Sequence, residues 1–200
     1  MFFNHISLVL FDSLVPSKDI FITACNKFFF LITNTSSGLT ASDTFFKEFI
    51  EDNKATIYKI CRAYANDPEE LKDFVQEVTI QLWRSHEKFE NRSKLSTWVY
   101  RVTLNVCLTL SKKRSRKVDT VSLLSTDYHD TNDETEKEQI ASLYKAIKRL
   151  KESERAIVLL YLDDKSYKEI AEILGITVTN VGARVNRVKN QLREIIKSGA

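Results

Sequence analysis

The chain has 200 residues, 43% of them hydrophobic, and a net charge of only +3, so it can hold one or two domains with a real hydrophobic core. It contains only four glycines and two prolines, and its long helical periodicities favour an all-α protein. The cysteines Cys25, Cys61 and Cys107 match neither zinc spacing nor a disulfide framework, and no catalytic motif is present, so we expect a cytoplasmic protein that is not an enzyme and holds no metal or other cofactor.

Residues 1–40 differ from the rest of the chain, because they are rich in Phe, Ile and Leu and interrupted by charges. No apolar run there reaches the ~18 residues of a membrane span, and no basic signal-peptide start is present. Since Met1 is the only methionine, we hypothesise that residues 1–38 are an upstream extension and that translation begins at the codon for Leu39. The intact mass of protein from its native host tests this, and a mass that includes residues 1–38 would reject it.

Two helices are expected next. Apolar residues recur at helical spacing over 44–64. The second helix begins after Asp67, with proline at its first position and Glu70 three residues beyond the cap, and runs to about Arg84. Its predicted buried stripe is Leu71, Phe74, Val75, Val78 and Leu82. Three polar residues share one of its exposed faces, which by itself indicates only a solvated surface: Asp73, Gln76 and Glu77.

A polar loop is predicted over 85–94 and a helix over 95–112. The residues predicted to face inward are Leu95, Val99, Val102, Val106 and Leu110. The helix carries Trp98 near its start and leads into the basic run KKRSRK at 112–117. Aromatic rings beside a basic, acid-free surface suit single-stranded nucleic acid, because bases stack on rings while cations hold phosphates. The alternative is a core role for Trp98 and a merely solvated basic run.

Residues 118–138 are rich in Ser, Thr and Asp and predict a linker. Helices resume at about 135–151 and over 153–162. A helix-turn-helix pattern follows, in which Gly175 ends the first helix in left-handed geometry and Thr177 caps the second. The residues predicted to be buried are Ile170, Ala171 and Leu174 in the first helix and Val181, Val185, Val188 and Leu192 in the second.

The charge is unevenly distributed along the chain. Net charges are +8 over residues 91–118, −6 over 119–138 and +5 over 139–200. The second helix of the helix-turn-helix has no acid between Ile176 and Arg193, as major-groove docking requires. Two basic blocks separated by an acidic one predict two nucleic-acid contacts on tethered domains. For the last segment alone, a helical hairpin with a solvated basic face is the alternative.

Taken together, residues 43–197 resemble an extracytoplasmic-function (ECF) sigma factor, the smallest class of bacterial sigma subunit. Three stretches carry the likeness: DPEELKDFVQEVTIQLWRS, KFENRSKLSTWVYRVTLNVCLTLSKKR and LKESERAIVLLYLDDKSYKEIAEILGITVTNVGARVNRVKNQL. The resemblance implies two small helical domains, a region 2-like one over 41–117 and a region 4-like one over 139–200, joined by the flexible acidic linker 118–138 after an N-terminal extension 1–40. In the family this linker threads toward the polymerase active-site cleft, whereas a plain tether is the alternative.

The resemblance also implies residue roles. The residues matching the family's minus-ten positions are Phe89, Asn91, Ser93, Trp98, Arg101, Asn105, Lys112, Lys113 and Arg114. There Phe89 would wall a pocket for an extruded base, Asn105 would support it, and the last three would hold phosphates. The family often has a glycine and an acid where this chain has Asn91 and Arg92, which leaves the identity of the flipped base open.

At the minus-thirty-five element the implied contacts are Thr177, Thr179, Asn180, Ala183, Arg184, Asn186 and Arg187. The first three lie at the start of the recognition helix and suit phosphates, and the others project toward base edges or flanking phosphates. Gly182 is a departure, since many relatives carry Lys or Arg there, so the DNA sequence is not carried over from relatives.

Asp73, Gln76 and Glu77 match family positions that contact the clamp helices of core RNA polymerase. The implied partners are core RNA polymerase (clamp helices and flap), promoter DNA and an anti-sigma factor, often membrane-bound, with a monomer when free. A conventional helix-turn-helix regulator, dimeric and binding duplex DNA without polymerase, is the second reading. A decoy that retains the fold is disfavoured because both basic surfaces persist, and an enzyme is the reading with least support.

Overall fold

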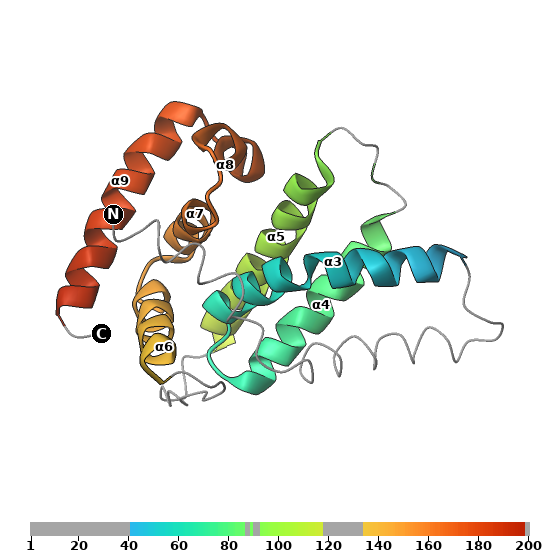
Figure 1. The fold of residues 1–200 in the computed structure, drawn as a ribbon, viewed down its shortest axis with the longest axis horizontal. Helices are drawn as coiled ribbons and strands as arrows, with labels where there is room; N and C mark the ends of the chain where they lie inside the picture. Colours follow the sequence, from blue (N-terminus) through green and yellow to red (C-terminus); the bar gives the residue numbers. More distant parts are fainter. Residues whose placement is uncertain (1–40, 87–88, 90–92, 118–133, 199–200) are drawn as a thin grey trace. The chain divides into compact units, whose positions relative to one another are not determined.

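The computed structural model describes residues 41–86, 89, 93–117 and 134–198, and within them it has helices and no strands (Figure 1). The helices are α3 (Ala41–Tyr64), α4 (Pro68–His86), α5 (Leu95–Lys117), α6 (Glu134–Lys148), α7 (Glu152–Leu162), α8 (Tyr167–Leu174) and α9 (Val178–Lys197). They form two compact units, an N-terminal one built mainly from α3–α5 and a C-terminal one from α6–α9. The predicted all-α class is therefore confirmed. The hypothesis about residues 1–38 and most of the predicted linker lie outside the described residues, although α6 already begins at Glu134.

The start of α4 shows how local sequence sets a helix boundary. The Oδ1 atom of Asp67 accepts a hydrogen bond from the backbone N–H of Glu70 at 2.8 Å, which satisfies one of the donors that a helix start leaves unpaired. In return, Oε2 of Glu70 accepts from the backbone N–H of Asn66 at 2.6 Å. The predicted cap is therefore confirmed, and Pro68 takes the first helical position where no N–H is needed.

The core of the N-terminal unit lies where α3 and α5 meet α4. All five residues of the predicted α4 stripe are buried, together with Thr79. Helix α3 contributes fully buried residues such as Phe46, Ile50 and Ile57. The Sγ atoms of Cys61 and Cys107 lie 3.8 Å apart as free thiols, and burial raises the pKa of the Cys61 thiol.

The buried face of α5 differs from the predicted one. Leu95 is 41% exposed, and Val102, Val106 and Leu110 are only half-buried. Of the predicted inward residues only Val99 is buried, and the remaining buried positions are Thr97, Tyr100, Thr103, Leu104, Cys107 and Ser111. The helix has apolar residues on more than one face, so periodicity alone could not choose between them, and packing selects a face that includes small hydroxyl side chains.

In the C-terminal unit, α8, a tight turn and α9 pack on α7. Gly175 has a φ of 66°, the left-handed geometry predicted for the helix end, and Thr177 accepts from the backbone N–H of Asn180 at 3.3 Å. The four predicted α9 core residues are all buried. In α8, Ile170 and Ala171 are buried as predicted, but Ile173 is buried in place of Leu174, which is half-buried.

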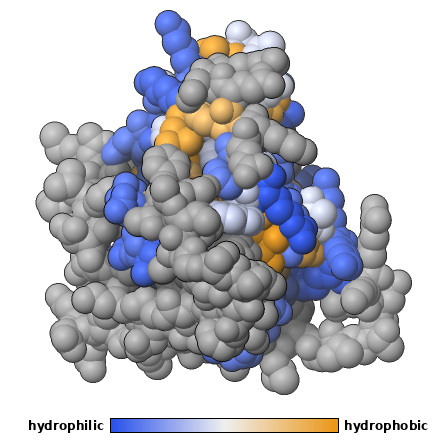
Figure 2. Space-filling model, turned by 90° about the vertical axis from the view of Figure 1, so that its right-hand side faces the viewer, coloured by the Kyte–Doolittle hydropathy of each residue, from blue (hydrophilic) through white to orange (hydrophobic). Residues whose placement is uncertain are grey.

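The described surface offers few large apolar side chains. The exposed ones are Leu95, Tyr167, Val178 and Ile196. On the face that Figure 2 shows, hydrophilic side chains predominate among the described residues and hydrophobic ones form separate small areas. No helix within the described ranges has the length and apolar character needed to cross a membrane. Polar and charged side chains therefore make up most of the described surface that a partner could contact.

Candidate nucleic-acid and protein interfaces

Helix α9 presents the predicted minus-thirty-five residues on one accessible surface. Six of the seven are exposed and Arg184 is half-buried. The first turn of α9 has no acidic residue, and the helix start carries the positive end of the helix dipole. Hydroxyl and amide side chains at a helix start can hold phosphates. Arginines one and two turns later can reach base edges.

Arg187 and Lys189 each contact a side chain of α7. The Nη2 atom of Arg187 lies 3.1 Å from Oε1 of Glu154, whose side chain is only 6% exposed. The Nζ atom of Lys189 donates to the hydroxyl of Tyr161 at 3.2 Å and lies 5.0 Å from its ring centroid. Sequence reasoning assigned no role to Glu154, and its place in the first turn of a predicted helix was the only available signal.

The cations of α5 differ in their exposure and in the contacts that they make. Lys112 and Lys113 are exposed, and so is Asn105, whereas Arg101 is half-buried. Arg114 differs, because its Nη1 lies 2.6 Å from both carboxylate oxygens of Glu70. Its Nη2 also donates to the Ser111 hydroxyl at 3.3 Å. This arrangement favours the two lysines over Arg114 as phosphate ligands, and all of these roles remain predictions.

The Arg114–Glu70 pair joins the end of α5 to the start of α4, with side-chain exposures of 22% and 19%. Replacing Arg114 with Ala should lower the free energy of unfolding of the N-terminal unit by roughly 1–2 kcal/mol, because a half-buried carboxylate loses its partner. Urea unfolding followed by tryptophan fluorescence measures this, since the only two tryptophans, Trp83 and Trp98, lie in this unit. Lys113→Ala, at an exposed position on the same turn, is the control, and equal stability of the two variants would contradict the prediction.

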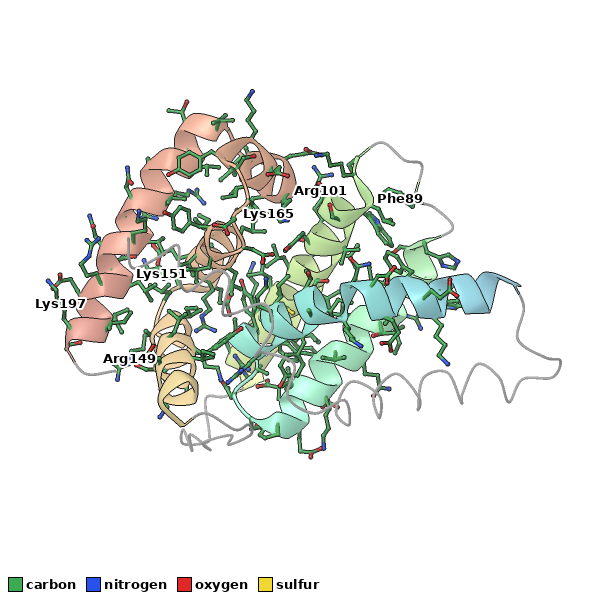
Figure 3. The ribbon with its side chains drawn as sticks, in the orientation of Figure 1. Phe89, Arg101, Arg149, Lys151, Lys165 and Lys197 are labelled. Atoms are coloured by element: carbon green, nitrogen blue, oxygen red, sulfur yellow. The ribbon has the colours of Figure 1, made fainter. Side chains whose placement is uncertain are left out.

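Phe89, for which the family resemblance implies a role as the wall of a base pocket, lies against Trp98 with ring centroids 5.2 Å apart. Its backbone N–H donates to the carbonyl of His86, the last residue of α4, at 3.1 Å. Figure 3 shows Phe89 and Arg101 toward the same end of α5. Ser93 is half-buried, and Asn91 lies outside the described residues. Phe89 and Trp98 are thus in contact, and Arg101 lies toward the same end of α5.

The Phe89–Trp98 contact continues into the body of the unit. Trp98 lies 6.0 Å from Phe49, Phe49 lies 5.7 Å from Phe46, and Phe46 meets Trp83 edge-on at 4.8 Å. These five rings, called here the aromatic chain, connect α3 and α4 to the loop. Aromatic pairs at such distances stabilise beyond their buried area. Sequence reasoning assigned Phe46 and Phe49 only to a helical stripe, and it could not show their link to the loop.

Helix α4 carries the acidic face that the sequence singled out. Asp73 is exposed, Gln76 and Glu77 are half-buried, and the Oε1 atom of Glu77 accepts from Nε2 of Gln81 at 2.9 Å. Two carboxylates one turn apart, outside the core stripe of α4, suit a basic partner surface. Within the described part of the chain, no three His, Cys, Asp or Glu residues are grouped so that they could hold a metal ion.

Comparison with known families identifies both units. The model of sigma-70 region 2 matches residues 49–117, and the model of sigma-70 region 4 matches residues 140–192. The chain is similar to the ECF RNA polymerase sigma factor SigW of Bacillus subtilis (strain 168), with 28% identity over 170 residues that cover 76% of this chain and 89% of SigW. It is also similar to the ECF RNA polymerase sigma factor SigE of Mycolicibacterium smegmatis, with 25% identity over 80% of this chain and 65% of SigE.

Two solved structures share the fold. The sigma factor RpoE in complex with the anti-sigma factor NepR, from Bartonella quintana, matches with a TM-score of 0.63 and 23% identity, over 78% of this chain and 98% of RpoE. CnrH, in complex with the cytosolic domain of CnrY, matches with a TM-score of 0.57 and 17% identity, over 78% of this chain and 89% of CnrH.

Proposed function

This chain belongs to the sigma-70 family, in its ECF group, and we propose that it binds core RNA polymerase and directs promoter-specific initiation, including promoter melting. The observation that carries the proposal is the order of two matched regions, 49–117 and 140–192, which lie mainly in separate compact units. In this role the chain is a non-catalytic subunit that works in the cytoplasm, where polymerase and promoters are.

In the proposed complex the N-terminal unit, 41–117, takes up the minus-ten element. Lys112 and Lys113 hold phosphates, and a base of the unwound strand is received beside Phe89 and Trp98. The exposed Asn105 supplies an amide to that strand. The C-terminal unit, 139–200, docks α9 in the major groove of the minus-thirty-five element, and the segment 118–138 links the two.

The partners follow from the same family membership. The face formed by Asp73, Gln76 and Glu77 binds the clamp helices of polymerase, and the C-terminal unit binds the flap. RpoE and CnrH were each solved with a partner, the anti-sigma factor NepR and the cytosolic domain of CnrY respectively. We therefore propose an anti-sigma factor for this chain as well, one that covers the polymerase-binding surfaces until a signal releases it.

Run-off transcription from host DNA, with purified core polymerase in the presence or absence of the chain, tests the proposal. Discrete start sites that require both proteins are expected, and their alignment gives both promoter elements. No new transcripts, together with tight duplex binding by the chain alone, would instead indicate a conventional helix-turn-helix regulator.

Arg187 should read a base in the minus-thirty-five element, because its side chain is 60% exposed on the recognition helix. Replacing Arg187 with Ala should cost about 1–3 kcal/mol on the preferred promoter and relax choice at one position. Transcription from promoters with single base-pair substitutions measures this. A loss of equal size on every promoter would instead mark Arg187 as a phosphate contact, and Arg193→Ala, farther along the exposed face of α9, is the matched control.

A further inference from the structure

Glu154 is an acidic residue buried in the first turn of α7, just after the α6–α7 turn that Lys151 marks in Figure 3. Its side chain is bound at both oxygens. Oε2 accepts from the backbone N–H of Lys151 at 3.3 Å, and Oε1 lies 3.1 Å from Nη2 of Arg187 in α9. Because one oxygen is held by the backbone of its own helix start, the carboxylate is a fixed anchor for the guanidinium.

Arg187 contacts Glu154 through one guanidinium nitrogen, and most of its side chain is exposed. Its side chain is 60% exposed although its Nη2 contacts a carboxylate that is 6% exposed. A guanidinium has five N–H donors in a rigid plane, so one contact at Nη2 leaves the rest of the plane for another partner. A long arginine side chain otherwise samples many rotamers, and the contact with Glu154 removes part of that freedom before any DNA is bound.

Whether the Arg187 side chain is held or free affects the sequence specificity of DNA binding more than its affinity. An arginine that is free to swing gains as much from a phosphate as from a base edge, and a phosphate contact carries no sequence information. An arginine held in one orientation matches a correct base pair and fits a wrong one poorly. Glu154 itself is buried, so it acts on DNA only through Arg187.

We propose that Glu154 is a specificity-determining positioning residue, which holds Arg187 so that the guanidinium reads one base pair of the minus-thirty-five element. The proposal rests on the proposed function, because it requires a promoter. It adds a residue of α7, outside the recognition helix, to the set that decides which promoters are used.

The test uses Glu154→Gln, because glutamine has nearly the same volume and its amide oxygen can still accept from the Lys151 N–H. What it removes is the negative charge beside Arg187. The full chain and core polymerase transcribe the mapped promoter with each minus-thirty-five base pair substituted in turn. Discrimination is the ratio of transcription from the preferred promoter to transcription from a substituted one. Glu154→Gln should lower this ratio at least about threefold at the one base pair where Arg187→Ala lowers it most. The double variant should lose no more than Arg187→Ala, because the two residues act as a unit.

The matched control is Glu194→Gln, which removes the same charge from an exposed pair in which Glu194 lies 3.6 Å from Lys197. Its discrimination should equal that of the unsubstituted chain. Thermal unfolding of each variant separates loss of positioning from loss of fold. Should Glu154→Gln not fold, Glu154→Asp keeps the charge, but its shorter side chain cannot span from the Lys151 N–H to Arg187, and the same loss at the same base pair is expected.

Three outcomes would overturn the proposal: full discrimination retained by Glu154→Gln, an equal loss at every base pair, or losses from Glu154 and Arg187 that simply add. An Arg187→Ala variant that relaxes no position would also overturn it. Failure of the proposed function is a separate result, because it is seen when the unsubstituted chain gives no polymerase-dependent start sites.

Discussion

Replacing Asp73 and Glu77 together with lysine should abolish binding of the chain to core RNA polymerase and leave its fold intact. Asp73 is exposed and Glu77 half-buried, and neither belongs to the core stripe of α4. On this face Nε2 of Gln81 donates to Oε1 of Glu77, and this bond joins two side chains of the same helix, so its loss costs little stability. Like charges brought together across an interface cost several kcal/mol, which predicts at least about a 100-fold loss of affinity.

Co-purification of the variant with core polymerase, followed by run-off transcription, measures this effect. The matched control reverses Glu51 and Asp52 to lysine, since both are exposed on α3 and the net charge changes by the same amount. Circular dichroism and tryptophan fluorescence of both variants should equal those of the unsubstituted chain. Undiminished co-purification of the Asp73/Glu77 variant would reject the role, and an equal loss in the control would assign the effect to net charge.

How much of the fold could be predicted depends on how local the determining interactions are. The turn of the helix-turn-helix was predictable because Gly175 and Thr177 act on residues within four positions of themselves. The α4 cap at Asp67 was predictable for the same reason. The inward face of α5 was not, because small hydroxyl residues such as Thr103 can be buried or exposed, and only the packing partner decides.

In the candidate site, too, features set by local sequence were predictable and features set by tertiary packing were not. Sequence identified the exposed polar residues of α9 and α4, because surface side chains need no distant partner to be accessible. It could not show that Arg114 is held by Glu70, 44 positions away, or that Arg187 is held by Glu154 from another helix. Such pairs depend on tertiary packing, and no periodicity in a single sequence reports them.

Phe46, which lies between Phe49 and Trp83 in the aromatic chain, is fully buried. Replacing Phe46 with Ala should lower the free energy of unfolding of the N-terminal unit by about 3–5 kcal/mol, from lost burial and the cavity left behind. Urea unfolding followed by tryptophan fluorescence reports this directly, since Trp83 is the edge-on partner of Phe46. Lys47→Ala, at the next and exposed position of α3, is the control and should unfold like the unsubstituted chain.

Phe46 also lies before residue 49, where the match to sigma-70 region 2 begins. A loss of several kcal/mol would therefore mean that the start of α3 is an integral part of this domain and not an appendage to it. The same variant should loosen the Phe89–Trp98 contact, because Phe49 bridges Phe46 to Trp98, and so weaken minus-ten recognition at temperatures where the unit is still folded. A loss below about 1 kcal/mol would be that of a surface substitution and would contradict the packing of Phe46 in this core.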